Sequence, residues 1–133
     1  MRLHARCLPM PFRSARDSFR VGLFILAALA ANASAAGDAT RGRMLYESRC
    51  IACHSIDANR IGPAHRGVVG RKAGSVSDYD YSAALKASRI VWSAQTLDRW
   101  LTDPENTIPG QKMGYTVPDA KDRADIIAWL SAN

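Results

Sequence analysis

The chain has 133 residues, a length that suggests one domain. Its 18 lysines and arginines outnumber its 12 acidic residues, which gives a formal net charge of +6. Residues 1–36 alone hold five of the arginines and only one aspartate. Residues 37–133 therefore carry only +2, from 13 basic and 11 acidic residues. This weak charge does not support nucleic-acid binding, which uses a strongly basic surface.

Residues 1–36 are predicted to be a secretory signal peptide that is removed on export to the periplasm. Arginines come first, then an apolar run over 21–31 that is too short to span a membrane, then small residues over 32–36. The alternatives are an amphipathic helix or a retained anchor. Two details stay open: cleavage after Ala35 or Ala36, and a true start at Met1 or Met10.

Residues 37–133 are predicted to form a single all-α domain, which begins with a helix over 38–50. Asp38 or Thr40 can cap this helix, because a short polar side chain can accept a hydrogen bond from the first free backbone amides. Residues 55–78 follow as a loop, since glycines, a proline and several serines interrupt any regular pattern.

Three more helices are expected, over 81–88, over 93–102 and from 118–119 onwards. Ser93 is the expected cap of the second of these. Residues 104–118 read as another loop, with three prolines and two glycines. The last helix shows an apolar stripe formed by Ala124, Ile127, Ala128, Trp129 and Leu130. About four short helices and long loops indicate a domain that wraps around a bound cofactor.

The motif that predicts this cofactor is Cys50-Ile51-Ala52-Cys53-His54, which has the C-x-x-C-H pattern of covalent haem attachment. Two cysteines at this spacing can each form a thioether with haem, and the following histidine can ligate the iron. A thioredoxin-like cysteine pair would require neighbouring strands, and a structural zinc site would require more ligands. The remaining cysteine, Cys7, lies in the predicted signal peptide.

The sequence pattern alone leaves three candidates for the second axial ligand of the iron. These are Met44, His65 and Met113. Met113 lies in a loop rich in proline and glycine, which can fold over the haem, whereas a single methionine elsewhere is commonly a core residue that fills a gap.

Residues 37–132 resemble the class I c-type cytochromes, the small bacterial cytochromes c that are similar to the mitochondrial protein. Gly42 and Tyr46 match the family's glycine and aromatic of the N-terminal helix, and Ile126 and Trp129 match their partners on the C-terminal helix. The resemblance implies the cytochrome c fold, with one covalently bound haem c.

The same resemblance implies a set of site residues. Gly62-Pro63 matches the turn whose proline carbonyl accepts a hydrogen bond from the iron-ligating histidine, here His54. The segment that ends at Met113 matches the loop that supplies the second axial ligand. The remaining haem-pocket residues that it implies are Arg71, Tyr79, Tyr81, Trp92 and Trp100.

Four residues depart from the family pattern, namely His65, Leu85, Trp100 and Gln111. His65 is the least expected, because the family places an aliphatic residue against the haem there. We expect its polar edge to face water and its pKa to stay near the ordinary value. The alternative is that its protonation tunes the reduction potential with pH.

The resemblance implies a periplasmic, monomeric electron carrier without stable membrane insertion. Its partners would be redox proteins: a membrane cytochrome complex, an oxidase, a reaction centre or a periplasmic dehydrogenase. Lys72, Lys86 and Lys112 are expected to steer acidic partners, unless they are ordinary solvated side chains. A haem enzyme would need an open iron position, which the matched methionine loop argues against. A third alternative is a subunit committed to one oxidoreductase.

Overall fold

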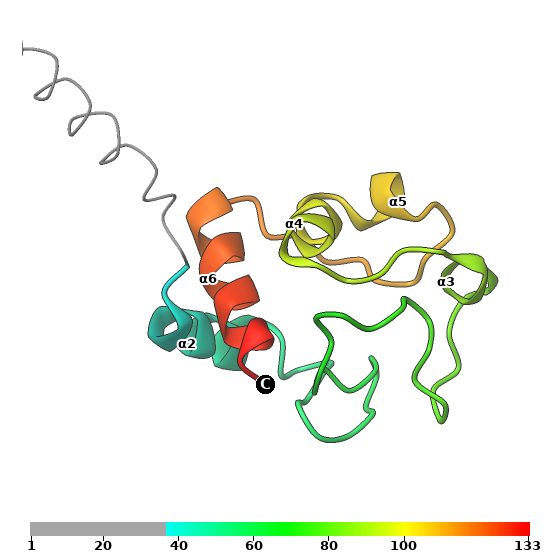
Figure 1. Cartoon of the computed structure of the whole chain (residues 1–133), viewed down its shortest axis with the longest axis horizontal. Coiled ribbons are helices and arrows are strands. Elements are labelled where there is room, and N and C mark those ends of the chain that lie inside the picture. Colours follow the sequence, from blue (N-terminus) through cyan, green and yellow to red (C-terminus); the bar gives the residue numbers. More distant parts are fainter. Residues whose placement is uncertain (1–36) are drawn as a thin grey trace, which may run out of the picture. The chain divides into compact units, whose positions relative to one another are not determined.

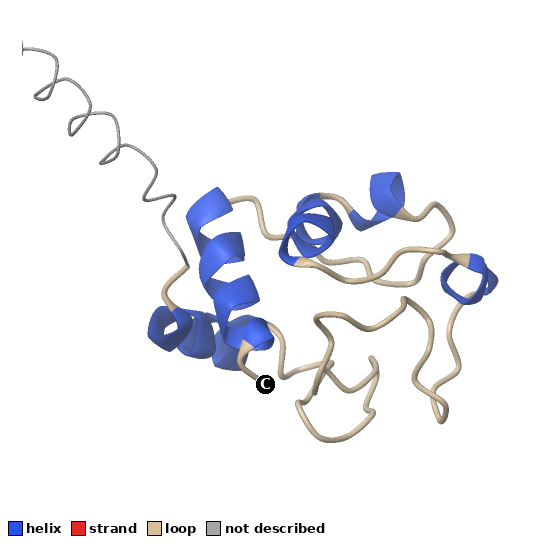
Figure 2. Ribbon diagram, in the orientation of Figure 1, coloured by secondary structure: helices blue, strands red, loops and turns tan. Residues whose placement is uncertain are grey.

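The computed structural model describes residues 37–133, and the predicted signal peptide lies outside them. Helices connected by long loops make up this part of the chain, and it contains no strand beyond one isolated bridge between Lys72 and Val91 (Figure 2). The helices, labelled as in Figure 1, are α2 (Ala39–Arg49), α3 (Ala83–Ala87), α4 (Ala94–Thr102), α5 (Pro104–Thr107) and α6 (Ala120–Ser131). The predicted all-α class is confirmed.

Capping side chains explain where three of these helices begin. Asp38 accepts hydrogen bonds from two backbone amides of α2, and Asp119 accepts one from α6. Ser93 and Thr96 form a reciprocal capping box at the start of α4. The four predicted helices are therefore confirmed, with α3 shorter than expected.

Helix α5 corrects the prediction of an unbroken loop over 104–118. Asp103 ends α4, but its side chain also accepts a hydrogen bond from the Asn106 amide and so caps a new turn. Pro104 occupies the first position of that turn, where its missing N–H is not needed. The Asp-Pro pair thus ends one helix and begins the next.

Helices α2 and α6, which lie at the two ends of the described chain, pack against each other (Figure 1). Gly42 allows this contact, since a Cβ built there would lie 1.9 Å from the Asp125 carbonyl oxygen. Tyr46 and Ile126 are buried beside it. The expected pairing of the two helices is confirmed.

Replacing Gly42 with alanine should destabilise the protein although alanine is the better helix former. The added methyl group overlaps the α6 backbone, and overpacking of this kind destabilises by about 1–3 kcal/mol, against a gain in helix propensity of about 1 kcal/mol. Urea unfolding of the holoprotein measures the effect. Met44→Ala is the control, since Met44 is 60% exposed on the same helix. Equal midpoints for Gly42→Ala and the wild type would contradict the close approach.

The buried face of α6 differs from the predicted apolar stripe. Ile126, Ile127 and Leu130 are buried, whereas Ala128 and Trp129 are only partly buried. Three charged residues of α6, Asp122, Arg123 and Asp125, are also buried, which the stripe did not predict.

These buried charges are paired, and the pairs join α6 to its neighbours. Asp125 contacts Arg41 at 2.5 Å and Lys121 at 2.9 Å, and it accepts a hydrogen bond from the Asp38 amide. Arg123 donates to Asp98 of α4 at 2.7 Å. Since a buried charge is unfavourable without such partners, the network fixes how α6 sits on α2 and α4.

Asp125 should make the protein sensitive to strong acid. Its hydrogen bonds with Lys121 and Arg41 lower its pKa from 3.8 to about 2. The ionised form therefore stabilises the fold above pH 4, and this contribution is lost as the pH falls through about 2. Asp125→Asn should be less stable at pH 7 and should lose less stability between pH 4 and 2, as measured by urea unfolding at each pH. Glu47→Gln, an exposed change on α2, is the control; parallel curves for Asp125→Asn and wild type would contradict the assignment.

Candidate cofactor site

A cavity of about 680 Å³ lies inside the domain, within the size range of ligand-binding pockets. Eight of the twelve residues of the hydrophobic core line it, so the core is also the wall of the cavity. Every site residue expected from the sequence lines this cavity: Cys50, Cys53, His54, Pro63, Arg71, Tyr79, Tyr81, Trp92, Trp100 and Met113.

The two cysteines lie on the turn that follows α2. The Cys53 and His54 amides both donate to the Cys50 carbonyl, at 3.1 and 2.8 Å, and all three residues line the cavity. The thiols are not bonded to each other, and burial raises the pKa of Cys50 to about 11. Such a thiol is protonated at neutral pH, unlike the reactive thiolates of redox cysteine pairs.

The zinc alternative finds no support either. Within residues 37–133, no group of three or more histidine, cysteine or acidic side chains is arranged to hold a metal ion. A structural zinc site requires four such ligands.

His54 is oriented by the turn at Gly62-Pro63. Its Nδ1 lies 2.8 Å from the Pro63 carbonyl oxygen, which can only accept, so Nδ1 carries the proton and Nε2 is free to bind a metal. A Cβ at Gly62 would lie 2.1 Å from the imidazole, which explains the glycine there. Burial lowers the pKa of His54, which favours the neutral, ligating form.

His65 is partly buried and lines the cavity on the side of His54, as predicted. Its ring stacks on that of His54, with 4.1 Å between the centroids and 20° between the planes, and its Nδ1 lies 3.1 Å from the Tyr46 hydroxyl. Burial lowers the pKa of His65 to about 3, so the expectation of an ordinary pKa was wrong. A histidine that stays neutral adds no charge near neutral pH, which argues against the pH-tuning hypothesis.

The structure separates the three candidates for the second axial ligand. Met113 lines the cavity and is partly buried against the core. Met44 does not line the cavity and is 60% exposed on α2. His65 lies against His54, on the side of the cavity where a ligand is already available.

The loop that carries Met113 is anchored by polar groups. The Met113 amide donates to the Gln111 side chain, which in turn donates to Glu105 of α5 at 3.2 Å. Glu105 also accepts from the Gly110 amide at 2.9 Å. Gln111, which departs from the family pattern, and α5, which was not predicted, therefore hold this loop in place.

The remaining predicted residues form two groups on the cavity wall. Tyr79 and Tyr81 meet edge to face at 4.7 Å, and Trp92 and Trp100 lie 5.3 Å apart. Arg71 donates to the carbonyls of Arg66 and Ala64, both at 2.7 Å, and Tyr79 donates to that of Ile61. Arg71 and Tyr79 thus brace the loop that surrounds His54.

Of the three lysines expected to steer partners, only Lys112 lines the cavity. Lys86 pairs with Asp80 at 2.8 Å, and Asp80 itself lines the cavity, so one positive charge near this edge is offset. Lys72 is exposed elsewhere on the cavity-forming loop. The prediction that all three surround one edge stays a prediction.

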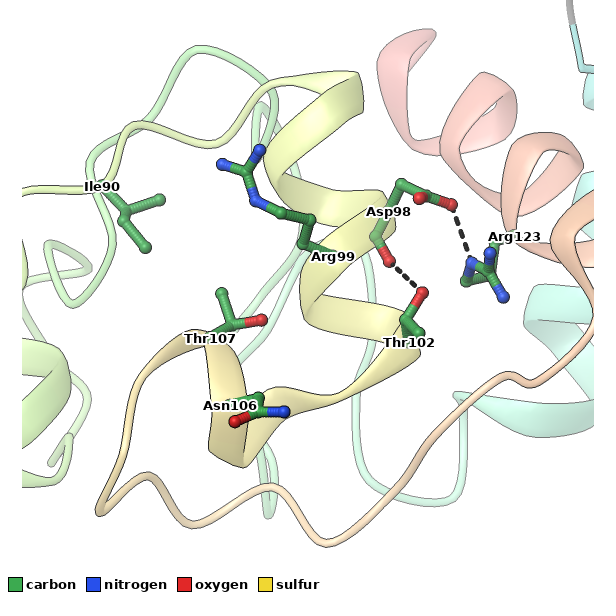
Figure 3. A pocket seen from close by; sticks show the side chains of 7 residues that line it. All are labelled: Ile90, Asp98, Arg99, Thr102, Asn106, Thr107 and Arg123. Carbon is green, nitrogen blue, oxygen red and sulfur yellow. Dashed lines mark hydrogen bonds and ion pairs between the residues drawn. The ribbon is translucent and has the colours of Figure 1, made fainter.

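A second hollow, of about 570 Å³, lies between α4, α5 and α6 (Figure 3). It contains no residue predicted to bind a cofactor. The Arg123 and Asp98 side chains on its wall bond each other, and Thr102 donates to the Asp98 carbonyl at 2.7 Å. These groups join helices, so the cavity that contains the cysteines is the candidate site.

Cysteines, an oriented imidazole and a methionine around an apolar cavity define a binding site for a covalently attached haem. The cytochrome c family matches residues 39–133 of the chain. Cytochrome c 2.1 of Caenorhabditis elegans is 43% identical over 98 residues, or 71% of this chain and 88% of that protein. Cytochrome c2 of Rhodopila globiformis is 43% identical over 97 residues, or 71% and 92%.

The solved structure of cytochrome cH from Methylobacterium extorquens shares the fold, with a TM-score of 0.70 and 41% identity over 73% of this chain and all of that one. The chain belongs to the cytochrome c family. Members of this family are electron carriers that bind one haem c covalently. No helix of residues 37–133 has the length and apolar character needed to cross a membrane.

Sequence reasoning missed two contacts of this site. The hydrogen bond between Tyr46 and His65 joins two side chains at positions where the family pattern expects packing. The presence of two polar groups at such positions was the signal in the sequence that could have predicted it. The contact of Gly62 with the His54 ring had no signal beyond the Gly-Pro turn itself.

Proposed function

We propose that this protein is a periplasmic carrier of single electrons, with one haem attached through Cys50 and Cys53 and ligated by His54 and Met113. One observation carries the proposal: a single cavity gathers these four side chains, although His54 and Met113 are 59 positions apart in the chain. When bound, the haem supplies iron that exchanges one electron between its ferric and ferrous states.

The residues of the chain set the conditions for that exchange. His54 presents Nε2 from a ring whose other nitrogen is held by Pro63, which limits rearrangement of the ligand. The Met113 thioether favours the reduced iron and so raises the reduction potential. A haem iron held by both His54 and Met113 would have no position left for a substrate, which favours a shuttle over an enzyme.

We propose that the polar wall of the cavity holds the acidic propionate groups of the haem. A guanidinium has five N–H donors, and the Arg71 bonds to two carbonyls leave others free. Tyr79, Tyr81 and Trp92 line the same cavity, and Trp100 packs against Trp92 near the methionine loop. The partners would be acidic redox proteins: a membrane cytochrome complex, an oxidase, a reaction centre or a periplasmic dehydrogenase.

Expression of the full chain in a bacterium able to mature c-type cytochromes tests the proposal. Mass spectrometry of the periplasmic fraction should give a chain that begins at Ala36 or Gly37 and carries one haem. Potentiometric titration should show a one-electron transition, and the reduced protein should not bind carbon monoxide. Rapid carbon monoxide binding or peroxidase turnover by the unmodified protein would favour an enzyme, and retention of residues 1–36 would contradict the export proposal.

A further inference from the structure

His65 is the polar side chain nearest to the expected iron ligand that no function above uses. Its ring lies face to face with that of His54, at 4.1 Å between centroids and 20° between planes. The hydrogen bond from Nδ1 of His54 to the Pro63 carbonyl, at 2.8 Å, prevents the imidazole from turning within the plane of its ring. A hydrogen bond at one edge still leaves the ring free to tilt about that edge. The stacked ring of His65 restricts this second movement.

His65 is itself held at three points. Its amide donates to the Ser55 carbonyl at 3.0 Å, and its carbonyl accepts from the Val68 amide at 2.9 Å, so its backbone is fixed. Its side chain is held by the Tyr46 hydroxyl at 3.1 Å. Tyr46 lies on α2 and belongs to the hydrophobic core, where its side chain is only 3% exposed. It is therefore a rigid support for His65.

The hydrogen bond links the two side chains directly. The Tyr46 hydroxyl has no other partner among the hydrogen bonds of residues 37–133, so Nδ1 of His65 is the one polar group that holds it. The arrangement is a chain of three rings, in which a tyrosine on α2 holds a neutral imidazole against the iron-ligating one.

We propose that His65 is a positioning residue for His54, and that Tyr46 acts on the haem iron through it. The plane of an axial imidazole decides how its orbitals overlap those of the iron, and neighbouring groups that orient a ligand tune the metal. This inference rests on His54 being the axial ligand, as proposed above. An aliphatic side chain at position 65 would fill the space but could neither form a hydrogen bond with Tyr46 nor present a parallel ring.

Proton NMR of the oxidised holoprotein tests the proposal, because the spread of the haem methyl resonances reports the plane of the axial imidazole. Tyr46→Phe, which removes only the hydroxyl, and His65→Leu should both shift the haem methyl resonances and the reduction potential. Tyr46→Phe in the His65→Leu background should cause no further shift, since Tyr46 acts through His65 alone. Ser48→Ala is the matched control, because it removes an exposed hydroxyl from the same helix.

A purely structural role would lower the unfolding midpoint in both variants and leave the haem methyl pattern as in the wild type, and that result would overturn the proposal. Additive shifts in the double variant would overturn the action of Tyr46 through His65. The spectrum of the unmodified protein separately reports whether histidine and methionine ligate the iron, so failure of the proposed function is seen before any variant is made.

Discussion

Replacing Cys50 or Cys53 with serine should abolish stable holoprotein, the largest effect that any single change in this chain is expected to have. A serine hydroxyl cannot form a thioether, so either change leaves at most one covalent link to the haem, and changing both cysteines leaves none. Because eight of the twelve core residues line the cavity, the domain loses the centre around which its core is built. A domain of about 97 residues has little other core to keep it folded.

The measurement compares haem content and folding in periplasmic extracts. Wild-type haem should stay with the protein in acidified acetone; each single serine variant should yield little holoprotein, and the variant with both serines should carry no haem that resists this extraction. Haem-free protein should give poorly dispersed NMR signals. Ser55→Ala, just beyond the motif, is the control and should keep its haem. A well-folded haem-free chain would show that the core does not depend on the cofactor.

Replacing Met113 with alanine should keep the haem but change its electronic properties. The thioether favours ferrous iron, so its loss should lower the reduction potential by on the order of 0.1 V or more, within the roughly 0.8 V range that axial ligands span. The opened position should bind carbon monoxide in the reduced state and azide in the oxidised state. The charge-transfer absorption band of the methionine–iron bond should disappear.

Met44→Ala is the control for this change, since Met44 is exposed and does not line the cavity. Its potential and spectrum should equal those of the wild type. If Met113→Ala keeps the wild-type spectrum and Met44→Ala loses it, the assignment of the ligand is reversed. If neither variant changes the spectrum, the second ligand is a different residue.

The haem-attachment motif and most helices could be predicted from the sequence because their signals are local. Cys50 to His54 form a contiguous pattern, and Asp38, Ser93 and Asp119 cap helices within three residues of themselves. Met113 could not be chosen from the pattern alone, since its role depends on a loop that approaches the cavity from a distant part of the chain. The family resemblance favoured it, and the geometry separates it from Met44.

Two of the failures of prediction share a physical cause, which is that a partner distant in sequence decided the outcome. The apolar stripe of α6 gave no sign that Asp122 and Asp125 are buried, because their partners Arg41 and Arg49 lie on α2. His65 was expected to satisfy its polar edge with water, but the Tyr46 hydroxyl is the hydrogen-bond partner of its Nδ1. Helix α5 was missed for a local reason. Asp103-Pro104 was taken only as the end of one helix, whereas it also begins the next.

The contact between α2 and α6 also determines when the haem-attachment segment becomes enclosed. Helix α2 precedes the cysteines directly, while α6, which packs on α2, is the last helix of the chain. The contact therefore joins the two ends of the domain, and closing so long a loop is slow compared with forming a local helix. We expect Cys50 and Cys53 to stay accessible until this contact forms, and haem attachment to precede it.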